Sequence, residues 1–234
     1  MNKRAILLAG GKGTRLKPYT INMPKPLVPI GETPIIEIII RQLAQHGFTH
    51  ITITLNHLAD MIKEFCGDGS KWNILIDYSL EDKPLSTMGP LKLIDDLPDN
   101  FLVMNGDVLT DLDFAGFYDS HIQTQNIFTI SSYLRDHKVD YGVLESNADD
   151  KLISFSEKPV LHYKVSMGVY MLNKKCLDVI PYDTFYGFDH LMLDLMKQKT
   201  PAIVRVFDGY WLDIGRPEDY EKACVDFEAG KIPV

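Results

Sequence analysis

A short apolar segment that stops at a glycine-rich turn constrains the fold most. Residues 4–9 read RAILLA, and the apolar run ends at Gly10, which is followed by Gly11 and Gly13. A short continuous apolar run bounded by glycines is typical of a strand buried on both faces, as in a parallel sheet covered by helices. The beginning of the chain therefore predicts an α/β fold with a turn at the carboxyl end of its first strand.

Strands and helices alternate over the next hundred residues. Further strands are expected at 50–55, 73–79 and 101–105, and helices at 34–46, 58–65 and 89–95. Thr33 is expected to cap the first of these helices, with Pro34 at its first position and Gly47 just past its end. This order predicts a Rossmann-like, mostly parallel mixed sheet flanked by helices, with ligands at the carboxyl ends of the strands.

The second half is richer in strand-like runs. These runs lie at 126–134, 141–146, 152–158, 165–172 and 202–207, with helices expected near 187–199 and 216–228. They predict a smaller, antiparallel-leaning lobe built onto the first. We expect a single domain over residues 1–234, with lobes of about 1–112 and about 113–234. The sequence shows no linker, internal repeat or appended domain.

Charge is distributed unevenly along the chain. The 234 residues carry 32 Asp and Glu against 24 Lys and Arg, yet six Lys or Arg and no acid precede Glu32. An acidic body argues against nonspecific nucleic-acid binding, which depends on broad basic surfaces. A small basic patch beside glycines suits one small anion, although a chance cluster on a solvated face is an equal alternative.

The chain has the pattern of a cytoplasmic protein. Its first residues lack a signal-peptide core, and no apolar run approaches the ~20 residues that a membrane span needs. Cys66, Cys176 and Cys224 are odd in number and have no metal-like spacing, so we expect reduced thiols. The sequence leaves the oligomeric state open.

The glycine turn fits neither common nucleotide motif. Leu16 stands where the dinucleotide fingerprint needs its third glycine, and no Gly-Lys-Ser/Thr sequence follows for a Walker A loop. The turn can still form a nest of backbone N–H groups for phosphate. Arg15 could grip phosphate oxygens, and Lys25, between two prolines, could hold a fixed charge. The alternative is a tight turn with solvated cations.

Asp107 is the first candidate metal ligand. It follows an apolar strand and Gly106, so it is expected at the same sheet edge as the glycine turn. A carboxylate beside phosphate-binding cations suits Mg²⁺, which prefers one or two carboxylates plus substrate oxygens and water. The alternative is an aspartate that caps the following turn. Asp111 and Asp113 better fit the turn and helix-cap positions.

Longer stretches of the chain resemble a known family. LLAGGKGTRLKPYTINMPKPLVPIGETPIIE is similar to the signature of the sugar-1-phosphate nucleotidyltransferases, and MNGDVLTDLDF, FSEKP, VSMGVYML and YWLDIGRPEDYEKA follow in family order. The style is that of short bacterial mannose- and heptose-1-phosphate guanylyltransferases. The resemblance implies transfer of a nucleoside monophosphate from a nucleoside triphosphate (NTP), with GTP slightly favoured, to a sugar 1-phosphate, and it implies Mg²⁺.

The resemblance also implies roles for particular residues. Asp213 becomes the second metal ligand beside Asp107, and Arg15 and Lys25 act with them in catalysis. Without the resemblance, Asp213 could equally be a cap of the last helix. Glu157 and Lys158 could be a surface ion pair, and Asp189 could be a helix cap. The implied nucleotide-binding residues are Leu8, Ala9, Gly10, Gly11, Gly13, Thr14, Arg15, Lys25, Thr87, Gly89 and Asp107. The implied sugar-phosphate residues are Gly142, Glu157, Lys158, Gly168, Tyr170 and Asp189.

One stretch departs from the family pattern. Residues 84–90 read PLSTMGP, where many members have PLGTAGA, so Ser86, Met88 and Pro90 replace smaller residues. We expect Met88 at the pocket wall, where it would pack against a purine or narrow the site. This departure leaves two alternatives: a cytidylyltransferase for a phosphorylated alcohol such as phosphocholine, and a catalytically degenerate nucleotide-sugar-binding protein.

Overall fold

One large mixed sheet forms the centre of the molecule. A computed structural model describes residues 3–232, and seven strands form a sheet in the order β12-β8-β11-β6-β1-β4-β5. Within this sheet β11 is antiparallel to both of its neighbours, while the other described pairs are parallel. The strands are β1 (Lys3–Leu8), β4 (Phe48–Leu55), β5 (Leu75–Leu80), β6 (Asn100–Asn105), β8 (Phe128–Lys138), β11 (Val160–Asn173) and β12 (Ile203–Phe207). The predicted mostly parallel sheet is confirmed.

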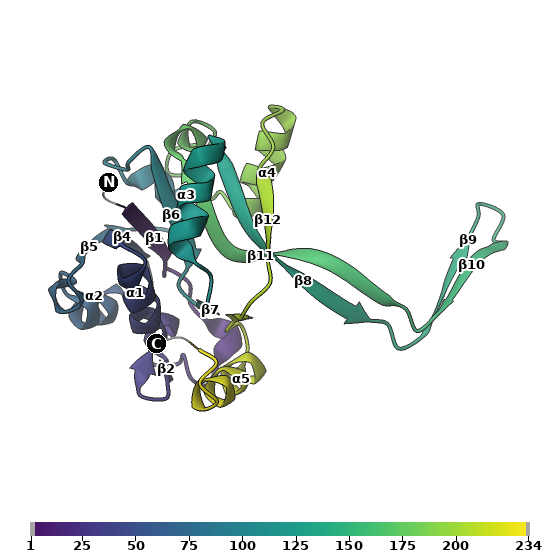
Figure 1. Ribbon diagram of the computed structural model, residues 1–234, viewed down its shortest axis with the longest axis horizontal. Helices are drawn as coiled ribbons and strands as arrows, with labels where there is room; N and C mark the ends of the chain where they lie inside the picture. The colour runs from purple at the N-terminus through teal and green to yellow at the C-terminus, as the bar shows by residue number, and fades with distance from the viewer. Residues whose placement is uncertain (1–2, 233–234) are drawn as a thin grey trace.

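Helices cover both faces of this sheet, as predicted (Figure 1). They are α1 (Ile35–Gln45), α2 (Ala59–Cys66), α3 (Phe114–Thr124), α4 (Phe188–Lys197) and α5 (Pro217–Glu228). Side chains alternate along β1, so Ala5 and Leu7 join the core beneath α1, whereas Ile6 joins a second core with Leu191 of α4. Both cores are apolar because the central strands are buried from both sides.

Three pairs of short strands lie outside the large sheet. They are β2 (Pro29–Ile30) with β3 (Thr33–Pro34), β7 (Val108–Thr110) with β13 (Trp211–Asp213), and β9 (Gly142–Ser146) with β10 (Leu152–Glu157). The β2–β3 pair corrects the expected helix start. Thr33 and Pro34 are extended and pair with Ile30 and Pro29, so Thr33 does not cap the helix, and α1 begins at Ile35.

The helix expected at 89–95 is also different. Residues Gly89–Leu93 form a short 3₁₀ helix, and the backbone N–H groups of Met88 and Gly89 both donate to the Tyr186 carbonyl. These bonds tie the start of the segment to a distant loop instead of to a longer α-helix. Gly47 does follow the end of α1, with φ of 79°.

Three strands of the second half join the large sheet, and β9 and β10 pair with each other in a separate antiparallel sheet. β8, β11 and β12 extend the first sheet, because β11 pairs with β6 from Val169 opposite Met104 to Asn173 opposite Asn100. The expected boundary near residue 112 therefore does not divide the sheet. The antiparallel character is concentrated in the small pairs and in a long ribbon.

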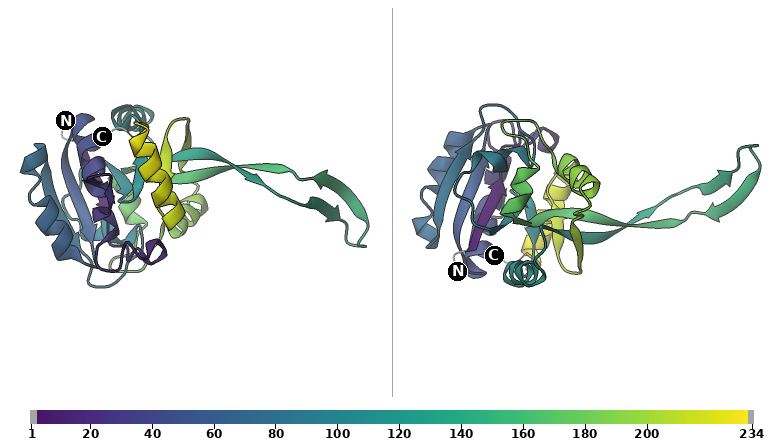
Figure 2. Two further views of the ribbon diagram at one scale, coloured as in Figure 1. Left: turned by 90° about the horizontal axis from the view of Figure 1, so that it is seen from below. Right: turned by 90° about the horizontal axis from the view of Figure 1, so that it is seen from above.

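That ribbon is here named the arm, residues 134–164. Past Tyr133, β8 pairs with β11 alone, and the β9–β10 hairpin lies at the far end (Figure 1). Two further views show the arm standing away from the helices and from the rest of the sheet (Figure 2). None of residues 134–164 is buried.

Two smaller expectations are tested by the described residues. Between residues 3 and 232 no helix has both the length and the apolar composition to cross a membrane. Cys66 and Cys176 are buried, Cys224 is partly buried, and all three are free thiols, as expected.

Candidate active site

Internal hydrogen bonds fix the glycine turn after β1. The Ala9 N–H donates to the Thr54 carbonyl at 3.0 Å, which fastens the end of β1 to β4. The Gly13 carbonyl accepts from the Leu16 N–H at 3.0 Å and from the Thr20 hydroxyl at 2.7 Å. Gly13 has φ of 60°, a conformation that glycine adopts without the cost of a Cβ. The turn is therefore held in shape without any ligand.

Lys25 and Asp107 form an ion pair at the carboxyl edge of the sheet. The Lys25 ammonium donates to Asp107 Oδ2, although the two residues are 82 positions apart. Their side chains are 11% and 24% exposed, so water screens the pair only in part. Lys25 lies between Pro24 and Pro26 and is the first residue of a short 3₁₀ helix. The two prolines restrict the backbone that carries the ammonium. The structure thus brings together two residues predicted to act together.

Asp213 reaches the same place through β13. It lies opposite Val108 in the β7–β13 pair, and the Ile214 N–H donates to the Asp107 carbonyl at 3.0 Å. Burial and the neighbouring Asp107 charge raise the pKa of the Asp213 carboxyl, while Lys25 and Arg15 act in the opposite direction. Its position in a strand explains why it is not the helix cap that sequence alone would allow.

The two carboxylates fit a divalent cation. Asp107 Oδ1 and Asp213 Oδ1 are buried, and neither has a hydrogen-bond partner among residues 3–232. Buried carboxylate oxygens without a hydrogen-bond partner are costly unless a cation neutralises them. In the described part of the chain, no three His, Cys, Asp or Glu side chains gather into a metal site. A cation here would therefore take its other ligands from substrate and water, as Mg²⁺ does.

A cavity of 390 Å³ opens between the glycine turn and Asp107. It brings together five of the predicted nucleotide-binding residues: Leu8, Gly10, Gly11, Thr87 and Asp107. Other lining residues were not predicted to bind nucleotide: Lys12, Thr54, Asn56, Glu81, Pro84, Ser86, Asn105 and Phe185. Lys12, Pro84, Ser86 and Asn105 lie within the stretches compared with the family pattern, whereas Thr54, Asn56, Glu81 and Phe185 lie in none of them.

Arg15 lies on the other side of the carboxylate pair. A second cavity, of 340 Å³, is lined by Arg15, Asp213 and Trp211 together with Arg135 and Arg216. Asp219 also lines this cavity, so its three guanidinium groups outnumber its two carboxylates, which suits an anion such as a phosphate. The site thus has two cavities, of which the first borders Asp107 and the second borders Asp213.

The stretch that departs from the family pattern shapes the first cavity. Thr87 lines it and also accepts the Phe188 N–H at 2.9 Å, so its hydroxyl caps α4. Ser86 has φ of 66°, a backbone conformation that favours glycine. The expectation for Met88 is wrong: its side chain is fully buried in the core beneath α4 and does not face the cavity. Gly89 is also buried, tight against the Thr184 carbonyl.

The predicted sugar-phosphate residues are divided. Gly168, with φ of 76°, packs against Asn105, and Tyr170 is buried with its hydroxyl 3.0 Å from that of Ser166. Burial raises the pKa of Tyr170 to about 12. Gly142, Glu157 and Lys158 instead lie on the arm, and the structure does not bring them to Asp107. Asp189 is exposed in the first turn of α4, which Gly187 caps.

The remaining predicted nucleotide residues lie at the turn itself. Ala9 is buried beneath the turn, and Gly13 packs against Thr20 and Lys25. Thr14 is exposed in a short 3₁₀ helix.

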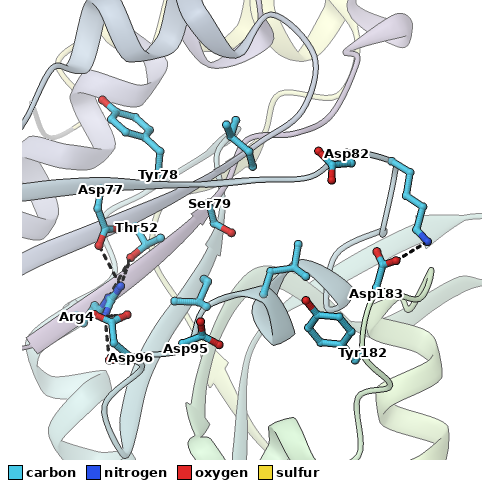
Figure 3. Close-up of a pocket in the computed structure, with 14 residues that line it drawn as sticks. Arg4, Thr52, Asp77, Tyr78, Ser79, Asp82, Asp95, Asp96, Tyr182 and Asp183 are labelled. Carbon is cyan, nitrogen blue, oxygen red and sulfur yellow. Dashed lines mark hydrogen bonds and ion pairs between the residues drawn. The ribbon is translucent and has the colours of Figure 1, made fainter.

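A larger cavity, of 750 Å³, lies elsewhere on the same sheet face (Figure 3). Its cations are already paired: Arg4 with Asp77 and Asp96, and Lys83 with Asp183. Asp82 and Asp95 add further carboxylates. Five carboxylates face two cations here, and both cations are already paired, so this cavity is a poor site for a polyphosphate despite its size.

The fold and the site together describe an α/β protein with two partly buried carboxylates beside a glycine turn at the carboxyl edge of its sheet. Residues 4–230 match the family model described as "Nucleotidyl transferase". The chain belongs to the nucleotidyl transferase family.

Individual relatives carry more specific names. The chain is 32% identical to the UTP–glucose-1-phosphate uridylyltransferase of Synechocystis sp. and 34% identical to a probable mannose-1-phosphate guanylyltransferase 1 of Oryza sativa subsp. japonica. These matches cover 94% and 93% of this chain and 62% of each relative, so the chain spans about three fifths of their length.

One solved structure matches over nearly its whole length. HddC from Yersinia pseudotuberculosis, crystallised with GMP-PN, is 31% identical, with a TM-score of 0.74 over 96% of this chain and 99% of that one.

Proposed function

We propose that the chain transfers a nucleoside monophosphate from an NTP, with GTP favoured, to a sugar 1-phosphate and releases pyrophosphate. The observation that carries the proposal is the pair of unpartnered oxygens on Asp107 and Asp213, beside Lys25 and at the border of the two cavities. The names of the relatives support the reaction class, and several of them, together with HddC, point to a guanine nucleotide.

Each side of the site has its own task. The cavity at Gly10, Gly11 and Lys12 would hold the triphosphate through backbone N–H groups and one ammonium. The cavity at Arg15, Arg135 and Arg216 would hold the second anion. Asp107 and Asp213 would hold Mg²⁺, which supplies charge neutralisation for the two polyanions when bound.

The chemistry needs alignment more than acid–base catalysis. A phosphomonoester has its second pKa near ~6, so a sugar 1-phosphate is mostly dianionic at neutral pH. One of its oxygens attacks the α-phosphorus, a new P–O bond forms, and the bond to the leaving pyrophosphate breaks. Lys25 and Arg15 would stabilise the charge that develops on the phosphoryl oxygens. No histidine or serine nucleophile is required.

The alternatives find less support in the geometry. A phosphocholine cytidylyltransferase needs an aromatic cage for a quaternary amine, yet Tyr170 and Tyr186 are buried and Arg135 lies over the Trp211 ring at 5.1 Å. A degenerate binding protein has no need of the aligned Lys25, Asp107 and Asp213.

Pyrophosphate release with Mg²⁺ tests the proposal. Each of ATP, GTP, CTP, UTP and dTTP is offered with a pool of sugar 1-phosphates. We expect release with GTP and a loss of about 100-fold or more in turnover for Asp107→Asn and Asp213→Asn. Thermal melting checks that both variants fold. Equal turnover by the wild type and both variants would overturn the assignment.

A further inference from the structure

The arm is a β-ribbon that lacks a hydrophobic cover. Its two strands are paired from Leu134 opposite Lys164 to Lys138 opposite Val160, and the β9–β10 hairpin continues it. A two-stranded ribbon is marginally stable in water unless a third strand or another surface packs on it. Since none of residues 134–164 is buried, the arm in this conformation needs a partner surface.

The arm also presents an apolar face. Leu144 and Phe155 are directly paired in the hairpin and are 66% and 58% exposed. Nearer the root, the side chains of Leu161 and Tyr163 alternate onto the same face as Val165 and Tyr133, which contacts Trp211 at the site. The other large exposed apolar side chains of the arm are Leu134, Tyr141, Leu152, Ile153 and Val160. An exposed set of this size marks an interaction surface.

The net charges of the hairpin and of the glycine turn indicate which surface the arm packs against. The hairpin, residues 140–157, carries five carboxylates and one lysine, a net charge of −4. The glycine turn, residues 12–25, carries four Lys or Arg and no acid, a net charge of +4. The same chain therefore holds an acidic hairpin on an extended arm and a basic turn on its core, and the two lie far apart (Figure 1).

A receiving surface lies at the arm's root. A cavity of 490 Å³ with a mainly apolar lining is bordered by Val165 of the arm's base, Phe188 and Met192 of α4, and Val204 of β12. Val204 and Val206 of the edge strand β12 are each 48% exposed. An exposed apolar edge strand is a place where another chain can add.

We propose that two copies of this chain exchange arms, so that each arm packs on the other copy and its hairpin covers that copy's site. A two-fold exchange gives both arms the same cover and closes the assembly as a dimer. It also brings Glu157 and Lys158 of one copy to the sugar side of its partner's site, and this last step rests on the proposed function.

Mass measurement tests the dimer without any activity assay. Sedimentation of the full chain across the micromolar range is expected to give twice the mass of one chain. The double variant Leu144→Ser/Phe155→Ser is expected to sediment as a monomer. The matched control Val225→Ser, an exposed valine on α5 (62% exposed), is expected to remain a dimer. A monomeric wild type at every concentration would overturn the exchange.

Complementation tests whether the arm acts on the partner. Asp107→Asn removes a site carboxylate outside the arm, and Lys158→Ala removes a lysine of the arm. Each variant alone is expected to have little activity. Co-expressed chains form mixed dimers in which one site has an intact core and an intact arm. Random pairing predicts recovery of about a quarter of wild-type activity.

No recovery would show that the arm closes on its own chain and would overturn the exchange. Full activity of Lys158→Ala alone would overturn the role of the arm. A wild type that is dimeric but inactive with every triphosphate would contradict the proposed function and leave the dimer standing.

Discussion

At the scale of single residues, the site includes side chains that belong to no sequence motif. Glu81 lies in the cavity between the glycine turn and Asp107, where its carboxylate accepts the Leu85 N–H at 3.0 Å. Burial raises the pKa of Glu81. Guanine carries an exocyclic amino donor that uracil lacks. A carboxylate at the cavity wall is the acceptor that such a donor needs.

Glu81→Gln is expected to lower kcat/KM for GTP about tenfold and to leave that for UTP nearly unchanged, since hydrogen bonds to charged groups contribute about 1.5–3 kcal/mol. The glutamine carbonyl can still accept from Leu85, so the loop stays in place. Kinetics with both triphosphates measure the effect, and an equal loss for GTP and UTP would show that Glu81 only supports the loop.

His121 makes stability depend on pH. Burial lowers its pKa from 6.5 to about 4, and its Nε2 has no partner among the described residues. The unfolded chain binds this proton at a higher pH than the folded chain. Stability therefore falls as pH drops from 6.5 to about 4, by up to about 3 kcal/mol from this residue.

The variant His121→Gln removes this contribution. Its free energy of unfolding is expected to fall less than that of the wild type over the same pH range, as measured by urea denaturation. Parallel curves for the two proteins would contradict the prediction.

At the scale of elements, sequence predicts what apolar patterning controls. β1 and β6 are recognisable because strands buried on both faces are continuously apolar, and Asp107 is recognisable because it follows β6 closely. The β2–β3 pair is missed because Thr33-Pro34 has the composition of a helix start. The arm is missed as well, because alternating strands have the same pattern whether their apolar face is covered or not.

Asp213 and Glu81 show what a local sequence pattern cannot predict. Their roles come from pairings between distant segments, β13 with β7 and residue 81 with the glycine turn. Local pattern contains no such information, so Asp213 could be assigned only through family resemblance.

The junction between residues 84–89 and α4 is a further long-range element contact. Thr87 caps α4 across 101 positions, so Thr87→Val is expected to destabilise the fold by about 1 kcal/mol. Urea denaturation checks it. Thr184→Val, which alters an exposed threonine nearby, is expected to cost less than about 0.5 kcal/mol. Equal losses of unfolding free energy in the two variants would show that the lost cap is not the cause.

At the scale of the whole molecule, charge organises the approach of substrate. The chain has a net charge of −8, yet the site opens beside Lys12, Arg15 and Lys25. On the proposed function, a triphosphate would therefore be attracted locally and repelled elsewhere. Raising salt from about 0.05 M to about 0.5 M is expected to raise KM for the triphosphate several-fold, because exposed charges are screened beyond a few ångströms.

Lys12→Gln is the matched variant for this effect. It is expected to raise KM at low salt and to flatten the salt dependence. A KM that is independent of salt in both proteins would contradict the argument.

The β7–β13 pairing also has a consequence for synthesis. Asp107 leaves the ribosome before Asp213, because β7 precedes β13 in the chain. Because domains fold as their elements become available during translation, a nascent chain can build its central strands and its glycine turn first. On the proposed function, the two carboxylates that would hold the metal come together only after β13 has paired with β7. The metal site would therefore be among the last parts of the molecule to form.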